Sequence, residues 1–149
     1  EAFESSFLFF FINKFDYSIK TQIQNPRKVY CMDNGFLVNM GFRLSEDKGK
    51  LVENLVAIEL KRREKEIFYH SDKYECDFLI REGNKIKEAI QVTYEINEKN
   101  KEREITGLIE ALNKFKLKEG LIITFDQKDE FKIEGKKIKV IPVWKWLLR

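Results

Sequence analysis

The chain of 149 residues is 43% apolar and 13% aromatic, which excludes an intrinsically disordered protein and predicts one domain with a sizeable core. Its 28 basic and 25 acidic residues leave a net charge of +3, too small to identify a nucleic-acid partner. Cys31 and Cys76 lack CxxC spacing and His70 is the one histidine, so we expect free thiols in a cytoplasmic protein and no histidine-based zinc site. No apolar run has the length of a membrane span, so we expect no membrane partner.

The first 48 residues are predicted to form two strands and a connector. Residues 7–12 are a bulky apolar run typical of a buried strand, residues 28–32 predict a second strand, and residues 33–35 have the composition of a turn. The chain opens without Met, so we expect it to be part of a longer protein. In this interpretation residues 1–48 join that part to a core of residues 49–149, and both form one compact domain.

A helix is predicted over residues 45–63, beginning near Ser45. Apolar residues at Leu51, Leu55 and Ile58 give one stripe, so we expect this helix to be well buried. The stripe is widened by Val52, Val56 and Leu60.

Glu53 lies among apolar neighbours of this helix, since Val56, Ala57 and Leu60 follow it at helical spacing. A carboxylate there needs a cation, a metal or hydrogen bonds to compensate its burial. The alternative is a glutamate at the rim of the core, or one hydrogen-bonded to a neighbouring strand.

The stretch YECDFLIREGNKIKEAIQVTY predicts a β-hairpin. If residues 83–85 form a three-residue loop, Glu82 pairs with Ile86, and Asp77 then falls opposite Gln91. Because side chains alternate across a strand, Asp77, Gln91 and Thr93 share one face of the hairpin.

The remaining elements predict the fold class. Ile105, Leu108 and Leu112 recur at helical spacing in a second amphipathic helix that begins near Arg103 and belongs to a unit ended by Gly120. A buried strand over residues 121–125, a hairpin and a short apolar helix close the chain. This order predicts an α/β domain with one mixed central sheet flanked by helices.

A helical glutamate followed by a hairpin with an aspartate on its first strand resembles the PD-(D/E)xK nuclease superfamily, which has a restriction-endonuclease-like fold. The resemblance implies catalytic positions at Glu53, Asp77, Gln91 and Thr93. Glu53 and Asp77 would be ligands of Mg²⁺, a hard cation that favours oxygen ligands. Gln91 stands where a second carboxylate is expected and Thr93 where the lysine is expected, so we expect weak Mg²⁺ binding through Glu53, Asp77 and the Gln91 carbonyl oxygen.

A more extensive similarity is carried by the segments KVYCMDNGFL, GKLVENLVAIELKRR, ECDFLI, IQVTYEIN and IPVWKWLL. In this order they are similar to the C-terminal domain of an archaeal and bacterial family of AAA-type ATPases, a nuclease-like domain of unknown function in which IQV is commonplace. The resemblance implies an N-terminal P-loop ATPase domain as a partner. The chain has no G-x-x-x-x-G-K-[ST] motif, so we expect no ATP binding here.

Three functions stay open, and the favoured one is a DNA-binding domain that has lost cleavage. Its predicted phosphate contacts are Lys61, Arg62, Arg63, Lys101 and Arg103. For the first three, the alternative is a solvated helix C-terminus. The second function is an active Mg²⁺-dependent endonuclease, with Lys61 or another lysine replacing the missing one. The third is an interaction or regulatory module for the ATPase, favoured by aromatic residues near both ends. A second copy of the chain is also among the expected partners.

Overall fold

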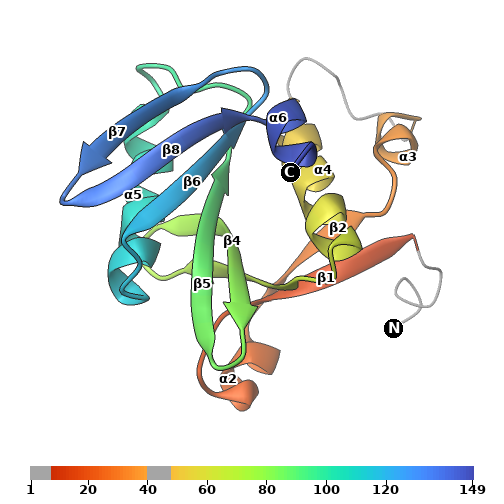
Figure 1. Cartoon of the computed structure of the whole chain (residues 1–149). Helices are drawn as coiled ribbons and strands as arrows, with labels where there is room; N and C mark the ends of the chain where they lie inside the picture. The colour runs from red at the N-terminus through yellow and green to blue at the C-terminus, as the bar shows by residue number, and fades with distance from the viewer. Residues whose placement is uncertain (1–7, 40–47) are drawn as a thin grey trace.

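One sheet of eight strands runs through the described part of the chain, residues 8–39 and 48–149 of a computed structural model (Figure 1). The strands are β1 (Phe9–Lys14), β2 (Arg27–Cys31), β3 (Glu66–Ser71), β4 (Glu75–Glu82), β5 (Lys85–Val92), β6 (Glu119–Thr124), β7 (Asp129–Ile133) and β8 (Lys136–Pro142). The helices are α2 (Ile19–Gln24), α3 (Asn34–Asn39), α4 (Lys48–Arg62), α5 (Lys101–Lys114) and α6 (Val143–Leu147).

The sheet is mixed, in the order β2-β1-β3-β4-β5-β6-β8-β7. β1 pairs with β3, β5 with β6 and β6 with β8 in parallel, whereas the other neighbours are antiparallel. The predicted mixed α/β fold with flanking helices is therefore confirmed. The strands of the N-terminal segment belong to this same sheet.

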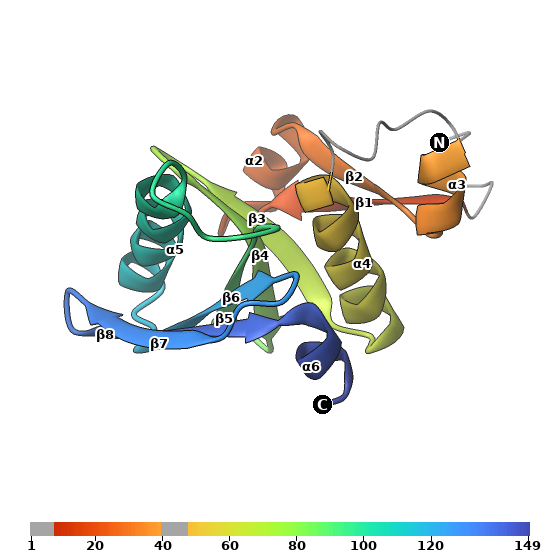
Figure 2. The same cartoon turned by 90° about the horizontal axis from the view of Figure 1, so that it is seen from above.

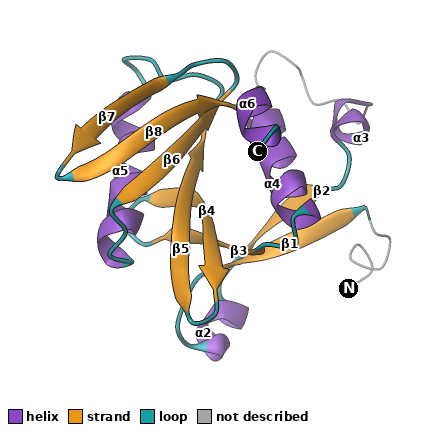
Figure 3. Ribbon diagram, in the orientation of Figure 1, coloured by secondary structure: helices purple, strands orange, loops and turns teal. Residues whose placement is uncertain are grey.

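Helices cover both faces of the sheet (Figure 2). On one face α4 and α6 lie together (Figure 3), and Val56 of α4 packs in a buried cluster with Phe78 and Ile80 of β4. On the other face Leu108 of α5 belongs to a second cluster with Leu79 of β4. β4 thus contributes to both core layers, as expected for a central strand.

The buried face of α4 differs from the predicted stripe. Val52, Val56 and Leu60 are buried at intervals of four residues, whereas Leu51 and Leu55 are only partly buried. The residues that widened the stripe in the sequence therefore form its centre. The predicted start at Ser45 lies outside the described residues.

Two further predictions near turns are wrong. The predicted turn at residues 33–35 begins helix α3, because the Asp33 carboxylate accepts hydrogen bonds from the backbone N–H groups of Gly35 and Phe36. Gly120 does not end a helical unit, since it lies inside β6. A side chain there would come within about 3 Å of Leu108 and Leu112 of α5.

The hairpin has a shorter turn than predicted. Gly83, with a φ of 59°, and Asn84 form a two-residue turn, and Glu82 pairs with Lys85 instead of Ile86. A bulge between Ile80 and Arg81 then restores the register. Phe78 pairs with Ile90 as the predicted register requires, because the bulge compensates for the shorter turn before the strands reach Asp77.

No helix among residues 8–39 and 48–149 combines the length and apolarity that a bilayer crossing requires.

Candidate functional site

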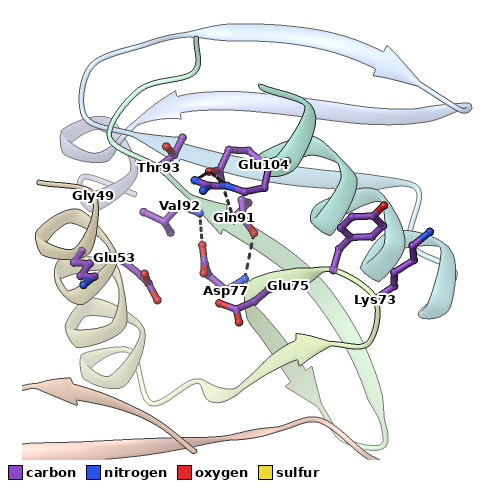
Figure 4. A pocket seen from close by; sticks show the side chains of 12 residues that line it. Gly49, Glu53, Lys73, Glu75, Asp77, Gln91, Val92, Thr93 and Glu104 are labelled. Atoms are coloured by element: carbon purple, nitrogen blue, oxygen red, sulfur yellow. Dashed lines mark hydrogen bonds and ion pairs between the residues drawn. The ribbon is translucent and has the colours of Figure 1, made fainter. Parts of the chain in front are cut away.

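A pocket of about 500 Å³ opens between the N-terminal turns of α4 and α5, where β4 begins and β5 ends (Figure 4). Glu53 approaches from α4 and Glu104 from α5, with Asp77 and Gln91 between them. The lining residues are Gly49, Lys50, Glu53, Lys73, Tyr74, Glu75, Asp77, Gln91, Val92, Thr93, Arg103 and Glu104. The four residues predicted as catalytic thus line one cavity together.

Asp77 and Gln91 face each other across the hairpin, as their register predicts. Asp77 Oδ2 accepts a hydrogen bond of 2.9 Å from the backbone N–H of Val92, and the N–H of Asp77 donates to Gln91 Oε1 at 3.3 Å. Gln91 Nε2 donates to Glu104 Oε2 at 2.7 Å. Both groups of the Gln91 carboxamide are therefore occupied inside the protein.

The carboxylate of Glu53 is compensated by two residues of β2. The Tyr30 hydroxyl donates to Glu53 Oε1 at 2.7 Å, and Lys28 Nζ lies 3.3 Å from the same oxygen. Burial and the charge of Glu53 raise the pKa of Tyr30, so its phenol stays protonated and donates. Of the alternatives for Glu53, the structure shows hydrogen bonding to a neighbouring strand.

Lys28 is the centre of the acidic cluster. Its Nζ lies 2.6 Å from Glu75 Oε1, 3.0 Å from Asp77 Oδ1 and 3.3 Å from Glu53 Oε1. The side chain is 20% exposed, and its burial would lower the pKa of Lys28, but Asp77, Glu53 and Glu75 outweigh this and raise the pKa. One permanent ammonium therefore stands among three carboxylates.

The position of Lys28 follows from how β2 meets α4. The Asn54 carboxamide accepts from the N–H of Cys31 at 2.8 Å and donates to the Cys31 carbonyl at 2.9 Å, in place of a neighbouring strand. This contact fixes β2 beside the first half of α4. Lys28 and Tyr30 are two residues apart on β2, so their side chains lie on the same face of the strand, and both reach Glu53.

The pocket carries more negative than positive charge around Lys28. A single ammonium balances one of the three carboxylates, and Asp77 is the most buried of them. Burial and the neighbouring Glu53 raise the pKa of Asp77 to about 7, against the opposing effects of Lys28 and the Val92 N–H. The Asp77 carboxylate therefore takes up a proton near neutral pH.

The donor set does not form a ready Mg²⁺ site. The oxygen of Gln91 is turned to the Asp77 N–H, and the carboxylates of Glu53, Glu75 and Asp77 are arranged around an ammonium. Mg²⁺ requires oxygen ligands at about 2.1 Å in octahedral geometry. These residues therefore fit the cation already present, Lys28, better than a divalent metal.

Thr93 occupies the predicted position of the missing lysine and has a local role. Its hydroxyl donates to the Glu95 carbonyl at 3.1 Å, and its N–H donates to the Ile123 carbonyl. Lys28, from a different strand, places an ammonium 3.0 Å from Asp77.

The five predicted phosphate contacts are split between two places. Arg103 lines the pocket, paired with Glu104 at 2.6 Å, and Lys101 lies over the Phe131 ring. The other three lie at the opposite end of α4, about 14 Å from Glu53 along the helix axis. There Arg62 and Arg63 bind Glu59, and Lys61 lies over the ring of Phe10.

Sequence reasoning missed two residues that contact Glu53 from β2, Lys28 and Tyr30, and two acidic residues that line the pocket, Glu75 and Glu104. The spacing of two residues between Lys28 and Tyr30 on a predicted strand indicates that they share a face. Nothing in the local sequence indicates that this strand meets α4. Glu104 could have been recognised from its place one turn before Leu108, on the buried side of the predicted helix.

A second cluster of titratable groups lies on the α5 side of the sheet. Among the described residues, His70, Asp72 and Glu110 are the one group of three whose ligand atoms lie within 4.8 Å of one another. Glu110 binds His70 at 2.7 Å, and Asp72 pairs with Lys114 at 2.6 Å and with Lys14 at 3.3 Å. These pairs satisfy the cluster internally. Cys31 and Cys76 are both buried free thiols, as predicted.

Comparisons with known proteins identify the family but give no activity. The chain is 39% identical to an uncharacterized protein, MJ1544, of Methanocaldococcus jannaschii over 99% of the chain and 35% of the relative. It is 29% identical to an uncharacterized protein of Haemophilus influenzae over the whole chain and 36% of the relative. The chain thus spans about a third of the length of these relatives, and no solved structure matches it. The model of a domain of unknown function, DUF4143, matches residues 48–146, and the chain therefore belongs to this family.

Proposed function

We propose that this domain binds nucleic acid and descends from a PD-(D/E)xK nuclease whose metal site has become degenerate. The observation that carries the proposal is the contact of Lys28 with Glu53, Glu75 and Asp77. A permanent cation in this place stands among the carboxylates where a divalent metal would bind, and it balances one of their three charges. The neutral residues Gln91 and Thr93 are consistent with the same loss.

The surroundings of the pocket suit a phosphate backbone. The N-terminal turns of α4 and α5 both border it, and helix N-termini favour anions. Lys50, Lys73 and Arg103 add side-chain cations at its rim. Contacts of this kind position a nucleic acid without reading its sequence.

A metal-dependent endonuclease is the second candidate, and one observation favours it. Lys28 supplies an ammonium beside Asp77 in place of the lysine that Thr93 lacks. In this case the lysine has moved to β2, and the pocket would keep its activity.

As a partner we propose the remaining two thirds of the longer protein. The similarity to the C-terminal domains of AAA-type ATPases supports a P-loop ATPase there, and the length of the relatives leaves room for one. In this arrangement the described domain would hold nucleic acid for the ATPase.

Anisotropy measurements with labelled DNA and RNA test the proposed function. We expect binding that weakens at least about tenfold between low and physiological salt, because phosphate contacts release counterions. Binding should be the same with and without Mn²⁺, and the nucleic acid should stay intact. Cleavage that requires Mn²⁺ and disappears in Lys28→Met would favour the second candidate instead.

A matched pair of arginine variants locates the binding surface. Arg103 and Arg62 are both highly exposed, at 78% and 69%, and each binds a buried glutamate near it in sequence. We expect Arg103→Ala to weaken binding severalfold and to make the salt dependence shallower. Arg62→Ala should behave as the unmodified protein. The reverse result would place the nucleic acid at the far end of α4.

A further inference from the structure

We infer that the nucleic acid bound at this pocket is single-stranded, with an unpaired base stacked on Phe125. This inference rests on the proposed function and specifies its ligand. The structural basis is a pair of stacked aromatic rings, Tyr94 and the exposed Phe125, beside the first turn of α4 that borders the pocket.

The ring pair is built by the pairing of β5 with β6. Beyond the strand ends, the N–H of Thr93 donates to the Ile123 carbonyl at 3.0 Å, and the N–H of Phe125 donates to the Tyr94 carbonyl at 2.9 Å. The rings of Tyr94 and Phe125 are stacked, with centroids 5.0 Å apart and planes 18° apart. The backbone pairing therefore places the two residues side by side, and their rings stack on one another.

The two rings have different surroundings. Tyr94 packs against the core cluster on the α4 face and is partly buried. Phe125 is 51% exposed, although it is a large apolar side chain. An exposed ring supported from behind by another ring resembles the stacking surfaces on which proteins bind unpaired bases.

A lysine of the first turn of α4 lies beside the Tyr94 ring. Lys48 Nζ lies 5.2 Å from the centre of the Tyr94 ring, and a Cβ added at Gly49 would lie 3.9 Å from the Tyr94 backbone nitrogen. The first turn of α4 therefore adjoins both the rings and the pocket, which Gly49 and Thr93 line. Phosphates of a strand that runs from the stacked base toward the pocket would pass Lys48 and this helix terminus.

A further aromatic residue, Tyr74, lines the pocket itself. Tyr74, in the turn before β4, is 39% exposed, and Lys73 Nζ lies 5.3 Å from its ring centre. Each of these aromatic groups thus has a lysine beside it, and the pocket adjoins both. A single strand could follow this path with bases on the rings and phosphates over the pocket. The rigid duplex keeps its bases stacked on one another and cannot use the rings.

The lysines beside the aromatic rings favour nucleic acid over an apolar peptide as the occupant. Lys48 lies beside the Tyr94 ring and Lys73 beside the Tyr74 ring, where they match the phosphates of a polyanion. Lys50 and Arg103 line the pocket together with its carboxylates. DNA and RNA share the chemistry of unpaired bases and phosphates, so both are included in the test.

The test uses oligothymidylate, oligouridylate and a DNA duplex, each labelled, in anisotropy titrations of the whole chain. We expect the single strands to bind more tightly than the duplex. Phe125→Ala should weaken single-strand binding at least about fivefold, the effect of losing one base–aromatic stack. Phe125→Trp should restore binding, whereas Phe125→Leu, which keeps an apolar side chain without a ring face, should not. Tighter binding of thymidylate or of uridylate identifies the source as DNA or RNA.

Tyr17→Ala is the matched control, because Tyr17 is also an exposed ring packed on another ring, that of Phe15, but is absent from the pocket lining. Its single-strand binding should equal that of the unmodified protein. Salt-dependent binding that Phe125→Ala leaves unchanged would overturn this inference and keep the proposed function. Binding of none of the three nucleic acids would overturn both.

Discussion

The two ends of α4 hold a buried or half-buried glutamate with opposite charge balance. At the N-terminal end Glu53 shares one ammonium, Lys28, with two further carboxylates, beside a cavity. At the C-terminal end Glu59 alone receives two guanidinium groups, those of Arg62 and Arg63. Around Glu59 the cations outnumber the acid, which stabilises the fold. Around Lys28 the acids outnumber the cation beside a cavity, an arrangement that costs stability and is typical of a functional site.

The C-terminal end also explains why an arginine-rich helix terminus need not bind nucleic acid. Arg63 donates to the Trp146 carbonyl at 3.2 Å and lies over the Trp146 ring. This residue therefore ties α4 to α6. The same three letters, KRR, are compatible with a phosphate-binding patch and with this structural contact.

The largest effect on the free energy of unfolding is expected from Lys28→Met. Removal of the ammonium leaves Glu53, Glu75 and Asp77 without their shared cation, and we expect a loss of about 2–3 kcal/mol in the free energy of unfolding, less than for a fully buried ion pair because Lys28 is 20% exposed. Urea denaturation at pH 8 measures it. Lys137→Met, which removes the exposed partner of Glu130, is the control and should change little. Equal small effects of both variants would show that Lys28 does not stabilise the carboxylate cluster.

Gly107→Ala tests how closely α5 must approach the pocket. A Cβ at Gly107 would lie 1.9 Å from the carbonyl oxygen of Glu75, so α5 would have to move away from the start of β4. We expect a loss of about 2 kcal/mol by denaturation, in spite of the better helix propensity of Ala. Gly49→Ala, whose nearest new contact is at 3.9 Å, is the matched control and should be neutral or slightly stabilising. A neutral Gly107→Ala would show that this close approach is not needed.

Glu59→Gln tests the ion pairs at the C-terminal end of α4 through the pH dependence of the free energy of unfolding. Hydrogen bonds from Arg62 and then Arg63 lower the pKa of Glu59 to about 2, against the effect of burial. A lowered carboxyl pKa gives stability that is complete above the unfolded pKa near 4.5 and is lost as the pH falls through about 2. We expect the variant to be less stable by about 1 kcal/mol above pH 5 and equal to the unmodified protein near pH 2. A difference that persists at pH 2 would contradict this assignment.

Asp77→Asn should have the smallest effect on stability. The Asn oxygen can still accept from the Val92 N–H, and the change removes one of three crowded negative charges. We expect the free energy of unfolding at pH 8 to change by less than about 0.5 kcal/mol or to rise, since the lost attraction to Lys28 is offset by lost repulsion from Glu53. A loss above about 2 kcal/mol would instead assign Asp77 a structural hydrogen-bonding role.

Local periodicity made much of the candidate site predictable. The alternation of side chains along the hairpin placed Asp77, Gln91 and Thr93 on one face, and the assumed three-residue loop placed Asp77 opposite Gln91. The bulge between Ile80 and Arg81 compensated the error in turn length. The mixed sheet and its flanking helices were predictable from the order of apolar segments along the chain and from their periodicity.

Contacts between distant segments were not predictable. Lys28 meets Glu53 and Asp77 across 25 and 49 residues, and the meeting depends on the Asn54 carboxamide bonding to the edge of β2. No spacing in the sequence encodes that pairing. The ring pair of Tyr94 and Phe125 was also missed, because it requires the parallel pairing of β5 with β6.

The most direct test of the account is a calorimetric titration of Mn²⁺ into the unmodified protein, Lys28→Met and the double variant Lys28→Met/Asp77→Asn. We expect no saturable binding to the unmodified protein, saturable binding to Lys28→Met because the carboxylates lose their internal cation, and loss of this binding in the double variant. Tight binding to the unmodified protein that Asp77→Asn abolishes would contradict the account, because the metal and Lys28 would then occupy the pocket together. Absence of any gain in Lys28→Met would also contradict it.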